Sequence, residues 1–390
     1  MALIDTEQEV LKRYAAASQS PEGALCCAVS YDPKYLAAIP QEILDRDYGC
    51  GDPSEYVRDG ETVLDLGSGS AKICYIASQI VGPTGRVIGI DFNPSMLALA
   101  RKYQKAIAER IGWDNVTFHR ARIQDLATDL DALERLIAER PVKTLEDYEA
   151  VEEARRKMVA STPLIADNSI DIVLSNCVLN LVRPEDKGQL FREIYRVLKR
   201  GGRIAISDIV SDEEVPAHLR NDPDLWSGCV SGAFQEREFL RAFEEAGFYG
   251  IHCVKRDEAP WQTVDGIEFR SITVIAYKGK DGPCLERNQA VIYQGPWSQV
   301  HDDDGHVLER GVPMAVCDKT FRIYTSEPYR DQIIPIPPRD EIPLDQAAPF
   351  DCARSAARHP FETKGRDYKE TTAATAAQDP CCPGDDDCSG

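Results

Sequence analysis

The chain has 390 residues, of which 43% are hydrophobic and 28% charged, a composition that is ordinary for a globular protein of two or three domains. The formal net charge of −20 disfavours nucleic acid and anionic membrane surfaces as partners, because both are bound through clustered Lys and Arg. No stretch reaches the ~20 apolar residues of a membrane span, and the segment MALIDTEQEV lacks the apolar core of a signal peptide. We therefore expect a cytoplasmic protein that binds neither nucleic acid nor a membrane.

The apolar residues near the N-terminus predict helices, and from residue 61 strands and helices alternate. A short helix is expected over residues 5–18, and a second helical region, interrupted at Pro40, over residues 32–47. The predicted strands cover residues 61–67, 86–91, 115–123, 169–179, 203–210 and 270–279, and the predicted helices between and after them cover residues 70–82, 94–112, 187–202 and 237–248. This alternation predicts an α/β fold in which parallel strands form a doubly wound sheet with helices on both faces.

Two further segments interrupt or follow this pattern. Residues 127–163 are charged and helical in pattern, which favours two surface helices in a solvated insertion; a lid or a partner surface is the alternative. Pro becomes frequent after residue 280, and residues 365–390 are polar enough to predict a disordered tail. That tail holds Cys381, Cys382 and Cys388.

A glycine-rich turn follows the first predicted strand of the sheet. In VLDLGSGSAK, Asp65 ends the strand, and Gly67, Ser68 and Gly69 form a turn whose backbone a ligand can approach closely. The second strand ends at Asp91, near the spacing of about 20 residues at which an acid accepts hydrogen bonds from ribose hydroxyls. The pattern predicts a nucleotide-type cofactor, and from the glycines alone NAD stays open.

Three of the 13 cysteines stand where a substrate would have to bind. Cys50 lies in YGCG before the first strand, Cys177 in SNCVLNLV at the carboxyl end of the fourth strand, and Cys229 in LWSGCVSGA after the fifth. Their spacing is not that of a zinc finger. Three distant thiolates that converge would form a soft trigonal site, which suits trivalent arsenic and leaves its lone pair free to attack an electrophilic methyl group. The remaining structured cysteines, Cys74, Cys253, Cys284, Cys317 and Cys352, are interpreted as small buried hydrophobic residues.

Taken together, YGCG, LDLGSGS, SNCVLNLV, RVLKRGG, LWSGCVSGA and VIYQG resemble the arsenite S-adenosylmethionine methyltransferases, over residues from about 22 to about 330. The resemblance implies a class I methyltransferase fold, a Rossmann-like doubly wound sheet with a mixed α/β metalloid-binding domain and a smaller C-terminal region. It implies methyl transfer from S-adenosylmethionine to arsenic bound by Cys50, Cys177 and Cys229, which serves arsenic detoxification. The expected substrate is arsenite or its thiol conjugate, and the expected state is a monomer.

The resemblance also implies roles for individual residues. The cofactor is expected to contact Tyr48, Asp65, Gly67, Ser68, Gly69, Asp91, Phe92, Asn93, Ile123 and Asn176. A further cysteine forms a disulfide with Cys50 during turnover; Cys27 is favoured over Cys26, and a thiol reductant, thioredoxin or glutathione, is then required. Two positions depart from the family pattern: Ala71 replaces a third glycine, and Gln124 stands where an acid is often found.

The implied domains divide the chain into four parts. Residues 1–210 would bind the cofactor, with the insertion at 127–163, residues 211–290 would bind arsenic, residues 291–364 would form a C-terminal domain, and residues 365–390 the tail. Two other functions stay open. One is a small-molecule methyltransferase that acts on oxygen, nitrogen or carbon, and the other is a metalloid-binding protein without catalysis, against which Asp65 and Asp91 argue.

Overall fold

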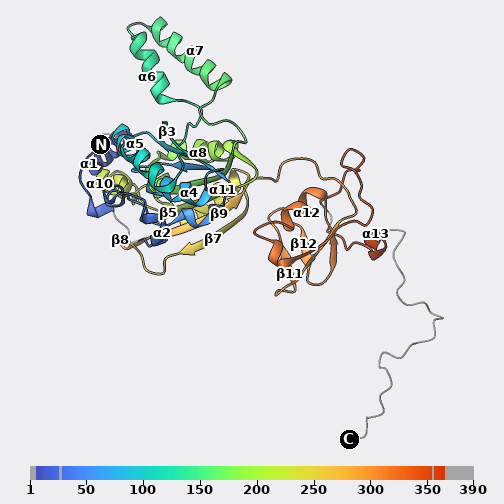
Figure 1. Ribbon diagram of the computed structural model, residues 1–390. Coiled ribbons are helices and arrows are strands. Elements are labelled where there is room, and N and C mark those ends of the chain that lie inside the picture. The colour runs from blue at the N-terminus through green and yellow to red at the C-terminus, as the bar shows by residue number, and fades with distance from the viewer. Residues whose placement is uncertain (1–5, 26–28, 354, 365–390) are drawn as a thin grey trace, which may run out of the picture. The chain divides into compact units, whose positions relative to one another are not determined.

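The computed structural model describes residues 6–25, 29–353 and 355–364, and the chain divides into two compact units, residues 1–280 and 281–390 (Figure 1). Each unit is described by itself. Among the described residues, no helix combines the length and the apolar character that a membrane crossing demands.

Unit 1 is built on one mixed sheet with the strand order β3-β2-β1-β4-β5-β9-β7. The strands are β1 (Thr62–Leu66), β2 (Arg86–Asp91), β3 (Val116–Arg120), β4 (Ile170–Asn176), β5 (Leu198–Ser211), β7 (Tyr249–Arg256) and β9 (Ile267–Tyr277), with the short β6 (Phe234–Gln235) beside β5 and β8 (Gln262–Val264) beside β9. The strands β1 to β5 pair in parallel, whereas β9 runs antiparallel to both β5 and β7. The predicted doubly wound α/β fold is confirmed, and β7 is an addition that the sequence pattern did not show.

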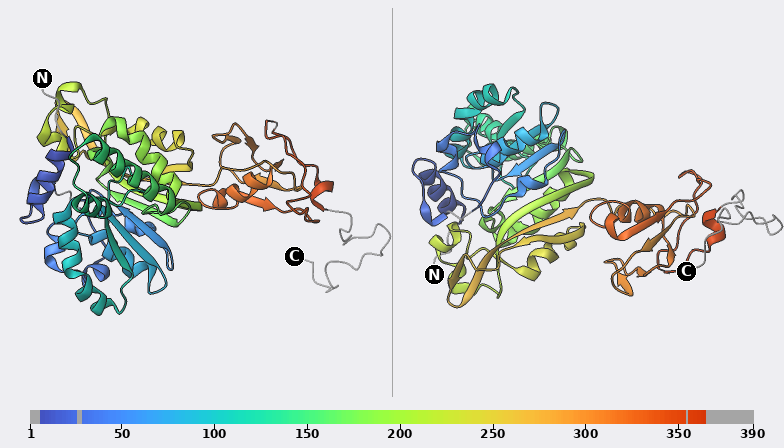
Figure 2. Two further views of the ribbon diagram at one scale, coloured as in Figure 1. Left: turned by 90° about the horizontal axis from the view of Figure 1, so that it is seen from above. Right: turned by 60° about the horizontal axis from the view of Figure 1, so that its bottom comes forward.

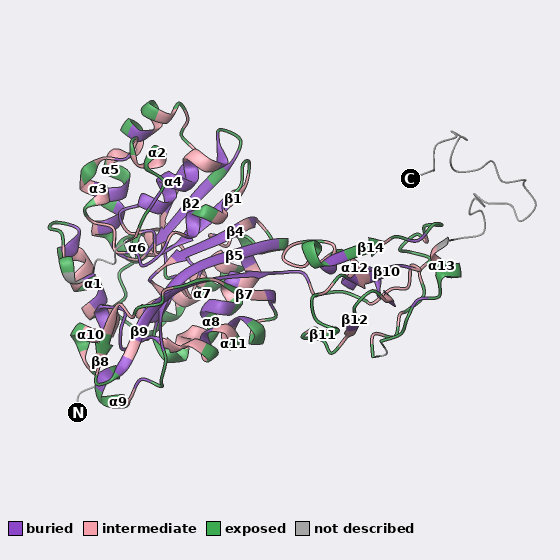
Figure 3. Ribbon diagram, turned by 90° about the horizontal axis from the view of Figure 1, so that it is seen from below, coloured by how far each residue is buried: buried purple, intermediate pink, exposed green. Residues whose placement is uncertain are grey.

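Helices cover both faces of this sheet, with α4 (Lys72–Val81) and α5 (Pro94–Ile111) on one face and α8 (Pro184–Val197) and α11 (Glu236–Glu245) on the other (Figures 2 and 3). Their local sequences explain their ends. The side chain of Asn93 accepts hydrogen bonds from the backbone N–H groups of Ser95 and Met96 at the start of α5, and Gly112 ends that helix with a φ of 93°. The buried strands in Figure 3 form the core between the two helical layers.

The register of the parallel strands brings three chain segments to one edge of the sheet. Leu66 of β1 is paired with Ile90 of β2 and with Ser175 of β4. The residues that follow each of these positions therefore lie next to one another at the carboxyl edge, where doubly wound sheets bind their ligands.

Shorter elements surround that edge. They are α1 (Thr6–Ala17), α2 (Pro33–Leu36), α3 (Gln41–Leu44), α9 (Ala217–Arg220), α10 (Pro223–Ser227) and the 3-10 turns Gly23–Leu25, Pro53–Tyr56 and Leu179–Leu181. The Arg13 side chain ties α1 to α10, because it donates to the Asp224 carbonyl oxygen at 2.8 Å and to Ser227 Oγ at 2.9 Å. Pro40 separates α2 from α3, as the sequence predicts.

The insertion forms a hairpin of two helices, α6 (Leu130–Glu139) and α7 (Leu145–Ser161), that projects from unit 1 in Figure 1. Val151 is the single residue of the two helices that is buried. The two predicted surface helices are confirmed, and most of their side chains face solvent.

Unit 2 contains a three-stranded antiparallel sheet and a separate hairpin. The sheet consists of β10 (Ala290–Tyr293), β13 (Pro313–Ala315) and β14 (Ile333–Ile336), and the hairpin of β11 (Gln299–His301) and β12 (Val307–Glu309). Two helices, α12 (Asp318–Tyr324) and α13 (Pro360–Lys364), and the 3-10 turn Arg330–Gln332 complete the unit. Its small core includes Val291, Tyr293 and Met314.

The predicted boundary at residue 210 falls within β5, which pairs with β9 along most of its length. The two compact units divide at residue 280, and the division of the chain into four domains stays a prediction.

Candidate functional site

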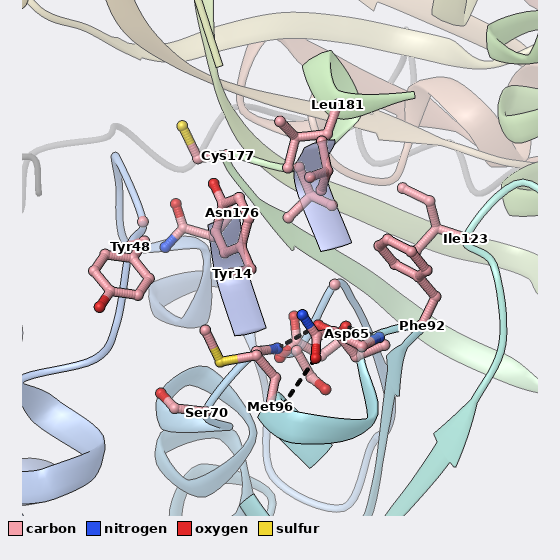
Figure 4. A pocket seen from close by; sticks show the side chains of 18 of the residues that line it. Tyr14, Tyr48, Asp65, Ser70, Phe92, Met96, Ile123, Asn176, Cys177 and Leu181 are labelled. Carbon is pink, nitrogen blue, oxygen red and sulfur yellow. Dashed lines mark hydrogen bonds between the residues drawn. The ribbon is translucent and has the colours of Figure 1, made fainter. Parts of the chain in front are cut away.

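A pocket opens at the carboxyl edge of the sheet, where β1, β2 and β4 end (Figure 4). All ten residues predicted to contact a cofactor line it, together with one of the three predicted thiols; they are Tyr48, Asp65, Gly67, Ser68, Gly69, Asp91, Phe92, Asn93, Ile123, Asn176 and Cys177. The tertiary structure therefore gathers one set of predicted site residues from five separate stretches of the chain.

The glycine-rich turn forms the floor of the pocket. Gly67 and Gly69 have φ values of 69° and 51°, in the left-handed region that glycine adopts without strain. A Cβ added at Gly67 would lie 2.5 Å from a methyl carbon of Val178, so a side chain does not fit there. A Cβ at Gly69 would meet no atom nearer than 4.0 Å and would instead fill open space in the pocket.

Asp91 lies beside this turn with its carboxylate held by backbone donors. Its Oδ2 accepts from the Gly69 N–H at 2.8 Å, and its Oδ1 accepts from the Asn93 N–H at 2.8 Å. Because a carboxylate offers about four acceptor positions, Asp91 can still accept a hydrogen bond from a ligand hydroxyl. Burial raises the pKa of Asp91, while the backbone N–H groups oppose this shift.

Two further polar groups near the turn suit a polar ligand. Burial raises the pKa of Asp65 to about 7, although the Cys74 thiol donates to its Oδ2 at 3.1 Å. Ser68 Oγ is buried and has no hydrogen-bond partner within the described part of the chain. A buried hydroxyl without a partner is costly, so a bound ligand that pairs with it would be favoured.

Apolar side chains line another part of the pocket. In Figure 4, Phe92 and Ile123 lie on one side, with Asn176, Cys177 and Tyr48 on the other. A flat ring such as adenine fits between aliphatic and aromatic side chains of this kind. The donors, acceptors, glycine cradle and apolar wall together fit S-adenosylmethionine.

The three predicted substrate cysteines are buried in one cluster at the end of this pocket. Cys50, Cys177 and Cys229 pack together with apolar side chains that include Ile209 and Phe269. Cys177 and Cys229 have φ values of 64° and 63°, which are unusual for residues with a Cβ. Strained backbone of this kind persists where the surrounding structure holds it, and it gathers at functional sites.

Cys177 is central to this cluster. Hydrogen bonding to the thiols of Cys229 and Cys50, together with burial, raises the pKa of Cys177, and burial raises the pKa of Cys50. The Cys229 thiol also donates to the Cys177 carbonyl oxygen at 3.0 Å. The three sulfurs do not all lie within 4.8 Å of one another. They must therefore move closer together to bind one ion.

Asn176 holds the Cys50 loop against the strand that carries Cys177. Its Oδ1 accepts from the backbone N–H groups of Cys50 at 2.9 Å and Gly51 at 3.1 Å, and its Nδ2 donates to the Gly51 carbonyl oxygen at 2.7 Å. The side chain that the sequence assigns to the cofactor thus also positions a thiol.

The sequence analysis missed the contribution of α1. Tyr14 and Glu7 both line the pocket, and the Tyr14 hydroxyl lies 3.8 Å from Cys229 Sγ. Glu7 forms an ion pair with Arg122 and accepts a hydrogen bond from Gln124 at 3.5 Å. The apolar spacing of residues 5–18 predicted the helix, but no local signal showed which part of the fold it covers.

The predictions for Tyr48 and for the Cys27–Cys50 disulfide have different outcomes. Tyr48 packs edge-on against Tyr14, with ring centroids 6.0 Å apart, and its hydroxyl donates to the Ala17 carbonyl oxygen at 3.0 Å. Cys26 and Cys27 lie outside the described residues, as do the tail cysteines, so the pairing of Cys27 with Cys50 stays a prediction.

Family models match both units of the chain. A model described as a methyltransferase domain matches residues 57–156 and 155–247, and one described as a domain of unknown function, DUF8838, matches residues 280–368.

Known proteins resemble the chain over most of its length. An arsenite methyltransferase of Aquipseudomonas alcaligenes is 33% identical over 314 residues, covering 76% of this chain and 80% of that protein. An arsenite methyltransferase of Mus musculus is 28% identical and covers 90% of this chain and 88% of its own. The crystal structure of an arsenic(III) S-adenosylmethionine methyltransferase from Chlamydomonas reinhardtii is 27% identical, with a TM-score of 0.54, and covers 85% of this chain and 100% of its own.

Proposed function

The chain belongs to the arsenite methyltransferase family, and we propose that it transfers methyl groups from S-adenosylmethionine to trivalent arsenic bound by Cys50, Cys177 and Cys229. The observation that carries the site assignment is the position of Cys177. This residue belongs both to the buried thiol cluster and to the wall of the cofactor pocket. A metalloid held by this thiol therefore lies at the boundary between the two sites.

Arsenic enters the cluster by exchange of its ligands. Each thiol that binds replaces one hydroxyl of arsenous acid, and its proton leaves with that hydroxyl as water, so the raised pKa values of Cys50 and Cys177 do not oppose binding at neutral pH. Soft sulfur ligands favour a soft ion such as trivalent arsenic. The arsenic keeps a lone pair, which serves as the nucleophile without a general base.

The residues of the chain bind and orient the two reactants. S-adenosylmethionine, when bound, supplies an electrophilic methyl group on a positively charged sulfur. Gly67 and Gly69 leave room for the cofactor, Asp91 accepts hydrogen bonds from its ribose, and Phe92 and Ile123 enclose its adenine. Asn176 holds the Cys50 loop in place, and Tyr14 covers Cys229, so that water is excluded from the thiol cluster.

Methyl transfer raises arsenic from the trivalent to the pentavalent state, and two electrons must return before another round. We propose that two cysteine thiolates supply these electrons and leave as a disulfide, for which Cys27 and Cys50 are the predicted pair. A thiol reductant, thioredoxin or glutathione, then restores both thiols. The predicted monomeric state, the cytoplasmic location and the role in arsenic detoxification are part of the same proposal.

The test is arsenic speciation after incubation of the protein with arsenite, S-adenosylmethionine and a dithiol. We expect methylated arsenicals from the wild type and from Cys253→Ser, a variant at an exposed cysteine of β7. Cys177→Ser should lose at least about 100-fold in rate, roughly 3 kcal/mol of transition-state stabilisation. It should still bind S-adenosylhomocysteine by calorimetry, because the glycine turn and Asp91 are unchanged.

Two outcomes would contradict the proposal. The absence of any methylarsenical product from the wild type would contradict the proposed activity. Full activity of Cys177→Ser on arsenite would contradict the assignment of Cys177 as an arsenic ligand.

A further inference from the structure

Unit 2 contains a second cluster of three cysteines, which the sequence pattern did not reveal. The sulfurs of Cys284, Cys317 and Cys352 all lie within 4.8 Å of one another. They come from three separate segments of the chain, and all belong to the region that matches a domain of unknown function. The interpretation of these residues as unrelated small hydrophobic side chains does not explain why three sulfurs share one place.

Backbone hydrogen bonds hold the three segments together. The Phe350 N–H donates to the Cys284 carbonyl oxygen at 2.9 Å, beside a bridge between Leu285 and Pro349. The Asp318 N–H donates to the Leu285 carbonyl oxygen at 2.9 Å, which joins the start of α12 to the same bridge. The fold of unit 2 therefore brings the sulfurs together through main-chain contacts at Cys284 and Leu285.

The central sulfur of the cluster is held by hydrogen bonds. Cys317 is fully buried, and its Sγ accepts from the Thr320 N–H at 3.4 Å and lies 3.2 Å from Thr320 Oγ1. Burial opposes ionisation, but the hydrogen bonds from Thr320 and from the thiols of Cys352 and Cys284 outweigh it and lower the pKa of Cys317. Cys352 shows the opposite shift, because burial and the adjacent thiols of Cys284 and Cys317 raise its pKa.

The composition of the cluster indicates the class of ion. No fourth His, Cys, Asp or Glu joins the group among residues 6–25, 29–353 and 355–364. Structural zinc is almost always bound by four ligands, whereas three thiolates match the pyramidal coordination of trivalent arsenic. The carboxylate of nearby Asp318 is paired with Arg287 at 2.8 Å and Arg322 at 2.6 Å, so it is engaged elsewhere.

An ion can reach this cluster from the surface. Cys284 and Cys352 are half-buried, whereas Cys317 lies beneath them. An ion would thus bind first to the two outer thiols and then to the inner one.

We propose that Cys284, Cys317 and Cys352 form a second binding site for trivalent arsenic, distinct from the three cysteines of unit 1. The choice of arsenic rests on the proposed function, whereas the existence of a three-thiolate site does not. Binding exchanges the three hydroxyls of arsenous acid for three sulfurs and releases three molecules of water, with no change in the oxidation state of arsenic.

The experiment counts arsenic atoms bound per chain. The full-length protein carries serine at the cysteines outside the described residues, which are Cys26, Cys27, Cys381, Cys382 and Cys388. After dialysis against arsenite with a phosphine reductant, we expect two arsenic atoms per chain in this background and in the control Cys253→Ser. One atom is expected in Cys177→Ser, one in Cys317→Ser, and none in the double variant.

Because Cys317 is buried, its substitution could unfold unit 2, and the half-buried Cys284→Ser and Cys352→Ser variants provide the second test. Each should lower the affinity of the second site at least tenfold while circular dichroism stays unchanged. X-ray absorption at the arsenic edge of Cys177→Ser should show three As–S bonds and no As–O bond.

Several results would overturn the proposal. These are two arsenic atoms still bound in Cys317→Ser, no arsenic atom bound in Cys177→Ser, or a zinc ion that occupies the cluster and resists displacement by arsenite. The failure of the proposed function is distinguishable, because it appears as a wild type without methylated product while the arsenic count of the Cys177→Ser variant stays at one.

Discussion

Around the site, three residues with side chains hold a backbone conformation that normally belongs to glycine. Ala71, Cys177 and Cys229 have φ values of 74°, 64° and 63°. All three lie around the cofactor pocket or the thiol cluster, and this conformation costs roughly 1–2 kcal/mol at each residue that carries a Cβ. At Cys177 and Cys229, the strained residue supplies a thiol that the proposed site requires. At Ala71, the side chain is only a methyl group, which has no such role.

Substitution of Ala71 by glycine should therefore stabilise the protein. Glycine removes the strain at φ 74° but adds freedom to the unfolded chain, so we expect a net gain of roughly 0.5–1 kcal/mol in the free energy of unfolding. Urea denaturation followed by circular dichroism measures it. A loss of stability would show that the Ala71 methyl group contributes more by packing than its backbone strain costs.

A second prediction at this scale concerns the buried carboxyl of Asp65. Burial raises its pKa to about 7 in the folded protein, whereas an Asp in an unfolded chain titrates near about 3.9. The folded state thus holds the proton more tightly, and this favours folding at low pH. The contribution is lost as the pH rises from about 4 through about 7, and it does not change further above that.

Asp65→Asn keeps an acceptor for the Cys74 thiol but carries no charge. We expect it to be more stable than the wild type above pH 7, by up to about 4 kcal/mol, with the difference shrinking toward zero near pH 4. The measurement is urea unfolding of the cofactor-free proteins at pH 5 and pH 8. A difference that is equal at both values would mean that Asp65 does not titrate between them.

Among the elements, α1 contacts both parts of the site. It contributes Glu7, Val10 and Tyr14 to the cofactor pocket, and Tyr14 also reaches Cys229. On its other flank, Arg13 binds α10, the short helix that precedes Cys229. The position of this helix therefore affects the binding of both reactants, although none of its residues belongs to the glycine turn or the thiol cluster.

Arg13→Ala should loosen α1 and weaken cofactor binding without a change in the pocket's own polar groups. The loss of hydrogen bonds made by a charged side chain costs about 1.5 kcal/mol, so we expect the Kd for S-adenosylhomocysteine to rise about tenfold. Calorimetry measures it, and Lys12→Ala, at the neighbouring exposed position, is the control. Equal affinities of the two variants would show that α1 docks independently of Arg13.

At the scale of the whole molecule, the cysteine clusters of the two proposed arsenic sites lie in different units. All residues that line the cofactor pocket, and all three thiols of the catalytic cluster, belong to unit 1. Unit 2 has its own small core and its own cysteine cluster. Cofactor binding should therefore depend on unit 1 alone.

A protein that ends at Lys280 should keep its affinity for S-adenosylhomocysteine within about threefold of the full chain, a difference of about 0.6 kcal/mol. The reason is that unit 1 contains the complete sheet and every described wall of the pocket. Calorimetry on the shortened and full-length proteins measures the two values. Loss of binding in a shortened protein with normal circular dichroism would show that unit 2 contributes to the pocket.

The features that depend on neighbours along the chain could be predicted from the sequence. Alternating apolar strands and helices, with glycines after the first strand and Asp91 after the second, predicted the doubly wound fold and the edge at which its ligand binds. Parallel strands must share a carboxyl edge, so residues that follow consecutive strands come together by necessity. The edge strand β7 was not predicted, because only two of its eight residues are buried and its apolar pattern is weak.

Contacts between segments that are far apart in the sequence became visible in the tertiary structure. In the fold, Tyr14 lies beside Cys229, and Asn176 binds the backbone of the Cys50 loop. Cys284, Cys317 and Cys352 form one cluster. The physical reason is that these contacts depend on the path of the intervening chain and on packing between elements. No spacing of residue types records either of these, so the same cysteines that appear unrelated in the sequence become neighbours in the fold.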